Sequence, residues 1–166
     1  MILIPKYKNT IELGGSLSII VTDTMNNKIK QELYVPNLVV TAGKTFIASR
    51  MVGTSATIMS HMGIGTSSTA EAAGDTALGA ELTVAGGYTG YSRASLTTAT
   101  SSANVVTYSA NFAANNPSAP SGGAVLREAG IFNASTAGTM LCRTTFPIVT
   151  KLPADALTVT WTITIQ

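Results

Sequence analysis

Charged side chains are scarce in this chain of 166 residues. Asp, Glu, Lys and Arg make up 11% of it, under half of the roughly 25% that is usual for a globular domain. No charged residue lies between Arg93 and Arg127. Because monomeric proteins depend on surface charge for solubility, the scarcity predicts that neighbouring molecules cover much of the surface in the working state. Assembly is the simplest interpretation.

Cysteine and histidine occur once each, as Cys142 and His61. A single cysteine excludes an intrachain disulfide and a thiolate metal cluster, and it favours production in a reducing compartment. Cys142 lies in a segment of alternating residues, so we expect a buried structural thiol. His61 lies within a predicted strand, where a packed or hydrogen-bonded side chain is expected rather than a general base.

Long apolar runs are also missing, although hydrophobic residues reach 45% and the mean hydropathy is +0.31. No stretch approaches the ~20 residues of a membrane helix, and no secretory signal is recognisable. The net charge of +2 is small, and the basic residues are scattered apart from Lys6 and Lys8. Nucleic-acid-binding proteins carry a stronger basic footprint. We therefore expect a soluble, unprocessed protein with neither a membrane nor a nucleic acid as partner.

Residues suited to catalysis are few. The closest carboxylates, Glu71 and Asp75, fall in a stretch rich in alanine and glycine, where we expect flexible, solvated side chains that cannot hold an acid/base geometry. The segment Ala42-Gly43-Lys44-Thr45 resembles the end of a phosphate-binding loop, but Leu38 stands where that motif requires glycine. We predict that the chain is not an enzyme and has no catalytic residue, no cofactor and no metal site.

The last ten residues alternate large apolar side chains with threonine. A period of two is typical of a strand with one buried and one exposed face. The apolar residues are predicted to face a core, and the other face carries Thr158, Thr160, Thr162 and Thr164. Such an uncharged face has two explanations, the high strand propensity of threonine or contact with another protein. We take the four threonines as candidate interaction residues.

Shorter segments with strand patterns precede the last one and are separated by turn residues. They cover residues 13–22, 29–35, 57–64, 105–112, 124–133, 139–146 and 147–153. One amphipathic helix of about ten residues is expected after Thr41, its candidate N-cap. Residues 65–79 and 115–123 are expected to be loops. The pattern predicts a mainly β protein, an antiparallel sandwich of jelly-roll type. Residues 1–12 are predicted to form an extended N-terminal arm and residues 13–166 a single domain.

Several blocks between positions 35 and 166 stand in a recognisable order. They are Asn37-Leu38-Val39-Val40-Thr41-Ala42-Gly43-Lys44, Ile47-Ala48, Met62-Gly63-Ile64-Gly65-Thr66, Asp75-Thr76-Ala77-Leu78, Glu128-Ala129-Gly130-Ile131-Phe132-Asn133, Leu141-Cys142-Arg143-Thr144-Thr145-Phe146-Pro147 and the strand around Trp161. In these blocks the chain resembles virion structural proteins of tailed double-stranded DNA bacteriophages, among which are head-decorating and tail-associated proteins. The resemblance implies a non-enzymatic, β-rich component of the virion, assembled in the host bacterial cytoplasm.

Our first hypothesis is a capsid decoration (cement) protein. It would form a homotrimer, bind the major capsid protein or neighbouring virion proteins between capsomers, and stabilise the head. The arm residues Ile2, Leu3, Ile4, Lys6 and Tyr7 are candidates for pairing with an exposed sheet edge of a neighbour. The alternative is a tail, baseplate or fibre-adaptor protein whose two long loops are tips. A cell-wall hydrolase is a third, weaker hypothesis.

Overall fold

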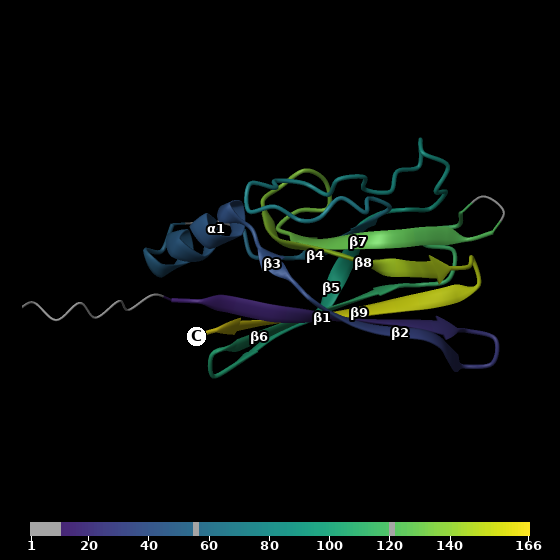
Figure 1. The fold of residues 1–166 in the computed structure, drawn as a ribbon, viewed down its shortest axis with the longest axis horizontal. Coiled ribbons are helices and arrows are strands. Elements are labelled where there is room, and N and C mark those ends of the chain that lie inside the picture. The colour runs from purple at the N-terminus through teal and green to yellow at the C-terminus, as the bar shows by residue number, and fades with distance from the viewer. Residues whose placement is uncertain (1–10, 55–56, 120–121) are drawn as a thin grey trace, which may run out of the picture.

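The protein is described by a computed structural model that covers residues 11–54, 57–119 and 122–166 (Figure 1). Within these residues the chain forms nine strands and one helix. In chain order they are β1 (Leu13–Asp23), β2 (Lys28–Pro36), β3 (Leu38–Val39), α1 (Thr41–Met51), β4 (His61–Gly65), β5 (Ala94–Ser102), β6 (Val105–Phe112), β7 (Ala124–Phe132), β8 (Met140–Lys151) and β9 (Asp155–Ile165).

All strands belong to one antiparallel sheet in the order β2-β1-β9-β6-β5-β4-β7-β8-β3, and this sheet is nearly closed into a barrel. Strand β5 joins its two halves, because its first residues pair with β4 and the rest pair with β6. The two ends of the sheet also meet. The Asn37 N–H donates to the Gly15 carbonyl over 3.3 Å, and the Thr150 N–H donates to Oε1 of Gln31 over 2.9 Å.

Strand β9 lies between β1 and β6 and supplies the centre of the core. Trp161 stands opposite Leu17 of β1 and Tyr108 of β6, and Trp161 and Leu17 are fully buried. Along β9 buried and half-buried residues alternate without a break from Asp155 to Thr164. The predicted alternation is therefore confirmed up to Thr164, whereas Ile165, which was predicted to face the core, is exposed.

The broad fold prediction is confirmed, since the protein is mainly β and antiparallel with one short helix. The sandwich of jelly-roll type is not confirmed by this strand order. Strand β5 is not among the predicted strands, because its small hydroxyl residues show no apolar alternation. Strand β8 replaces the two segments predicted on either side of Pro147. The strand continues through Pro147 because its register with β7 shifts at this point. At such a bulge one residue is left unpaired, so the missing N–H of proline breaks no hydrogen bond of the sheet.

Helix α1 begins at the residue predicted to be its cap, one residue earlier than expected. Thr41 is its first helical residue, and the N-cap is Val40, which makes no side-chain capping bond. Gly43 is the one buried residue of the helix. A Cβ at this glycine would overlap the backbone of Leu141, so the helix rests backbone to backbone on β8. The remainder of α1 projects past the end of the barrel (Figure 1). No helix in the described ranges has the length and apolar character to cross a membrane.

Candidate functional site

The outward side of β1, β9 and β6 forms the surface that we call the hydroxyl face. The strand registers place Thr158, Thr160, Thr162 and Thr164 along its centre. It comprises Ser16, Ser18, Ile20 and Thr22 of β1, the four threonines of β9, and Val105, Thr107, Ser109 and Asn111 of β6. The structure therefore brings the four predicted threonines together with small and hydroxyl-bearing neighbours on both sides.

Two of the central threonines bond across to β6. The amide Nδ2 of Asn111 donates to Oγ1 of Thr158 over 3.1 Å, and the hydroxyls of Ser109 and Thr160 lie 3.4 Å apart. All four threonines are half-buried by their neighbours. Because their β-branched side chains stand close together on the pleated surface, the face is well ordered and presents methyl groups and hydroxyls to whatever covers it.

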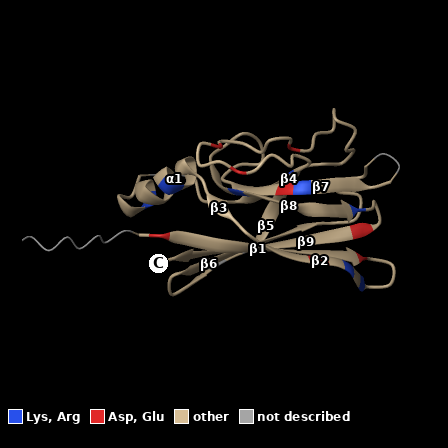
Figure 2. Ribbon diagram, viewed as in Figure 1, with Lys and Arg blue, Asp and Glu red and all other residues tan. Residues whose placement is uncertain are grey.

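No residue of the hydroxyl face carries a charge. Figure 2 shows the acidic and basic residues of this half of the sheet at the strand ends and on β2, while the strands between them are free of either colour. On β2 the exposed side chains Lys28, Lys30 and Glu32 mark the border. Charges on an edge strand are a common protection against strand pairing. The uncharged surface thus ends where the edge of the sheet begins.

The other predicted interaction residues, Ile2, Leu3, Ile4, Lys6 and Tyr7, lie outside the described residues. The chain is described from Ile11, and the backbone of Glu12 exchanges two hydrogen bonds of 2.8 Å with that of Gln166. Glu12, the last residue of the predicted arm, therefore lies beside the end of β9.

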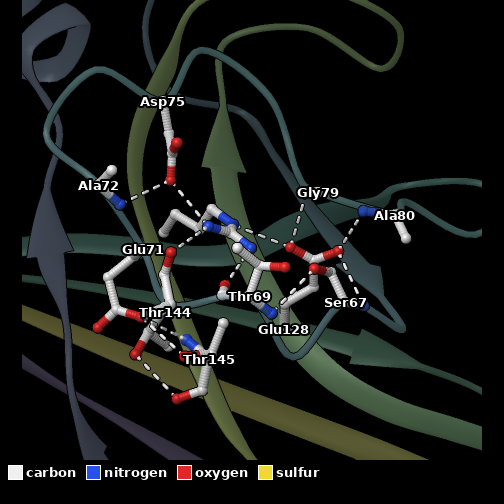
Figure 3. Close-up of polar contacts among 12 residues, drawn as sticks. Ser67, Thr69, Glu71, Ala72, Asp75, Gly79, Ala80, Glu128, Thr144 and Thr145 are labelled. Carbon is white, nitrogen blue, oxygen red and sulfur yellow. Dashed lines mark hydrogen bonds and ion pairs between the residues drawn. The ribbon is translucent and has the colours of Figure 1, made fainter.

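A buried ionic cluster lies on the opposite half of the sheet (Figure 3). Its centre is Glu128 of β7, whose side chain is inaccessible to solvent. Its Oε2 accepts from the Nε of Arg143 and from the Gly79 N–H, both over 2.9 Å. Its Oε1 accepts from the N–H groups of Ala80 over 2.6 Å and Ser67 over 3.3 Å. Each carboxylate oxygen thus has two donors, which is its full capacity.

Arg143 of β8 uses its remaining donors on the same loop. Its Nη1 bonds Oδ2 of Asp75 over 2.8 Å, and its Nη2 bonds the Thr69 carbonyl over 2.9 Å. A backbone hydrogen bond from Ala72, together with the bond and charge of Arg143, holds the pKa of Asp75 below its usual value. The cluster therefore ties the loop of residues 66–80 to β7 and β8.

This cluster corrects the prediction for Glu71 and Asp75. The carboxylate of Glu71 accepts from Oγ1 of Thr145 over 2.8 Å, and Asp75 pairs with Arg143. Neither side chain is the free, solvated group that was expected. The sequence offered no signal for this, because Arg143 and Glu128 lie far from the loop along the chain and become its partners only in the folded sheet.

A second ion pair fixes the turn between β7 and β8. Arg93 is bidentate on Glu81, with Nε–Oε1 of 2.7 Å and Nη2–Oε2 of 2.8 Å. Its Nη1 donates to the carbonyls of Ala134 and Ala137, and its guanidinium carbon lies 3.5 Å from the centre of the Phe132 ring. The pair borders a shallow depression of about 490 Å³. Because Arg93 and Glu81 bond each other and the backbone of the turn, this ion pair stabilises the fold.

Cys142 and His61 lie as predicted. The thiol of Cys142 is fully buried, and burial raises its pKa. His61 is half-buried, and its Nδ1 lies 2.8 Å from the hydroxyl of Ser60. Gly43 and Lys44, from the segment that resembles a phosphate-binding loop, are inside α1. Among the described residues no three His, Cys, Asp or Glu side chains are placed to hold a metal ion.

Comparison with protein-family models, with curated proteins and with solved structures gives no match for this chain. The hydroxyl face and the two ion-pair clusters are therefore interpreted on their own geometry.

Proposed function

We propose that this protein is a structural component of a bacteriophage particle and that it contacts neighbouring subunits through the hydroxyl face. The observation that carries the proposal is the absence of charge from all outward residues of β1, β9 and β6. When water leaves such a surface, the methyl groups gain and each hydroxyl needs one hydrogen bond, whereas each buried charge would cost far more without a partner. The resemblance to virion proteins supports the same role.

The size of the face indicates how it would be used. With strands about 4.8 Å apart and a rise of about 3.4 Å per residue, the face measures on the order of 15 by 27 Å, or about 400 Å². A stable pairwise interface buries about 800 Å² on each partner. One copy would therefore bind weakly through this face alone, and many copies on a lattice would act together.

This property favours the decoration of a capsid, where the same contact is repeated across the head. We propose that the protein binds between capsomers and stabilises the joints, with the major capsid protein as partner. The two halves of the sheet would then act as the layers of a jelly-roll-like sandwich, one turned toward the capsid. A tail, baseplate or fibre-adaptor protein is the second candidate, favoured by the long loop of residues 66–80 on the far side of the barrel.

The proposal is tested by placing charge on the face. Thr160→Lys combined with Thr162→Lys should reduce the occupancy of the protein on purified phage heads by at least about tenfold, because two ammonium groups would lose water without gaining partners. Occupancy is measured by quantitative mass spectrometry of particles separated from free protein.

Ser135→Lys with Thr136→Lys is the matched control, since it adds the same charge to exposed residues of the β7–β8 turn. It should leave the occupancy unchanged. Equal occupancy of the two double variants would overturn the proposed role of the hydroxyl face. The number of copies per particle separates the candidates, because a decoration protein is present in hundreds of copies and a tail protein in a few dozen or fewer.

A further inference from the structure

A groove separates α1 from the first residues of the described chain. It encloses about 480 Å³. Its lining is mostly apolar and comprises Ile11, Leu13, Ile47, Ala48 and Met51, with Glu12 and Lys44 as the charged members. Ile11 and Met51 are 68% and 74% exposed. An apolar surface on both walls of one groove is the form expected of a binding site for an extended or helical segment.

Within the described part of the chain, the sheet edge that lines the groove has no pairing strand. Glu12 directs both its N–H and its C=O to Gln166, and backbone groups in an antiparallel strand alternate in direction. The N–H and C=O of Ile11 and Leu13 therefore point away from β9. On that side β2 pairs with β1 only from Ser16 onward. Gly15 lies two residues after Leu13, so its backbone groups point the same way. Its carbonyl accepts a hydrogen bond from the Asn37 N–H on the side away from β9, as this geometry requires.

Helix α1 forms the other wall and is only partly packed, because Phe46 and Ile47 lie against the core whereas Met51 in its last turn is exposed. It has 11 residues, of which only Gly43 is buried. Isolated helices of this length are marginal in water and depend on burial of an apolar face. Yet Met51 and Val52 at its end are largely exposed. A segment in the groove would cover this apolar surface and pair with the open edge at the same time.

The first ten residues of the chain have the properties of such a segment. They begin Met1-Ile2-Leu3-Ile4, and Ile2 and Ile4 fall on one side of an extended chain. The chain is extended at Glu12 and leads outward from the barrel, on the side where α1 projects (Figure 1). An arm continuing in this direction spans up to about 33 Å. This length would suffice to reach a neighbouring molecule, whereas entry into its own groove would require a reversal of direction.

We infer that the groove between α1 and the start of β1 is the docking site for the N-terminal arm of a second copy of this chain. The arm adds a strand to the open edge of Ile11 and Leu13 and packs Ile2 and Ile4 against Ile47 and Met51. Because each copy carries both the arm and the groove, the exchange either closes reciprocally around a two-fold axis or passes from copy to copy around a ring or along an array. Self-association of this kind is separate from the proposed contact with a capsid and does not depend on it.

Disulfide trapping tests the inference on the full chain. Two differently tagged chains are co-expressed, one with Ile4→Cys and the other with Met51→Cys, and oxidised after purification. The native Cys142 is buried and does not interfere. A disulfide that joins the two chains between positions 4 and 51, identified by peptide mass spectrometry, is the expected product. Met25→Cys replaces Met51→Cys in the control, because Met25 is also an exposed methionine, at 88%, but lies in the β1–β2 turn.

The outcomes are distinct. If a single chain carrying both Ile4→Cys and Met51→Cys closes an internal disulfide and remains a monomer, the arm occupies its own groove and the inference is wrong. A cross-link to Met25→Cys as efficient as that to Met51→Cys, or no cross-link to either, also overturns it.

Sedimentation velocity supplies a second measurement. The full chain should self-associate, and either removal of residues 1–7 or Met51→Asp should weaken this association by about tenfold or more. Met25→Asp should have no effect. A full chain that remains monomeric, or a deletion variant that associates equally well, contradicts the inference. Both measurements use purified protein without phage heads, so their failure is distinguishable from failure of the proposed function.

Discussion

Lys151 occupies the most unfavourable environment of any charged residue described in this structure. It ends β8, its side chain is fully buried, and its Nζ has no hydrogen-bond partner among the described residues. The nearby carboxylate of Asp155 is instead bonded to Lys30, with both Nζ–O distances at 3.0 Å. Burial consequently lowers the pKa of Lys151 to about 8, and the charge of Asp155 offsets only part of that effect.

We expect Lys151→Met to stabilise the protein at pH 7. A shift of the pKa from 10.5 to about 8 corresponds to about 3 kcal/mol of destabilisation while the folded state is protonated, and a methionine of similar length removes it. The pKa of about 8 already includes the attraction to Asp155, so the measured gain in the free energy of unfolding should be about 3 kcal/mol at most. Urea denaturation at pH 7 provides the measurement.

The dependence on pH separates this explanation from a simple gain in packing. Between pH 8 and 10.5 the folded protein loses the proton of Lys151 while the unfolded chain retains it, so the wild-type contribution rises with pH. The advantage of Lys151→Met should shrink by up to about 1.4 kcal/mol per pH unit over this interval. The other titrating groups are common to both proteins and cancel. An advantage that stays constant from pH 7 to 10 would contradict the assignment.

At the scale of elements, the loop of residues 66–80 shows how a segment without regular structure is held in place. Glu128 supplies acceptors for its N–H groups, and Arg143 supplies donors for its carbonyls. Both side chains come from neighbouring strands and are bonded to each other over 2.9 Å. The loop is thus held to the sheet by one pair of neighbouring side chains, Glu128 and Arg143.

Arg143→Met should release this loop. The change leaves the carboxylate of Glu128 buried without its ionic partner, which costs about 3–5 kcal/mol. Hydrogen exchange at the amides of Ser67, Gly79 and Ala80, which bond Glu128, should accelerate more than exchange in β9. Arg127→Met is the control, because it removes a neighbouring positive charge that has no ion pair among the described residues. Its effect should stay within about 0.5 kcal/mol, and similar losses in both variants would contradict the role of the cluster.

Elements with strong local patterns were predictable from the sequence, and those defined by distant partners were not. The alternation in β9, the β1–β2 hairpin and the single helix each follow from residues within one segment. Strand β5 was missed because threonine, serine and alanine carry no apolar alternation, and its strand form depends on pairing with β6. The ionic cluster was missed for the same reason, since Asp75 and Arg143 are 68 positions apart. The threonines of the candidate surface were predictable as a set, because one strand contains them all.

At the scale of the whole molecule, the two candidate surfaces are complementary in character. The hydroxyl face is broad, ordered and too small for a stable pairwise contact, whereas the groove beside α1 is narrow and offers an open backbone edge. A face that forms a weak lateral contact and an edge that is completed by another chain are together suited to a repeating array, in which neither contact needs to hold a single pair of molecules.

The hydroxyl face also determines how its contacts respond to ionic strength. Salt weakens attraction between charges by screening, with a Debye length of about 8 Å at 0.15 M and about 3 Å at 1 M. Since no outward residue of β1, β9 or β6 is charged, these strands would contribute no Coulomb attraction to the proposed contact for ions to screen. Occupancy on heads should therefore be nearly equal in 0.05 and 1 M NaCl, as a co-sedimentation series measures, and a steep loss with salt would point to charged residues elsewhere. Particles whose subunits are joined in this way would keep these contacts at both low and high ionic strength.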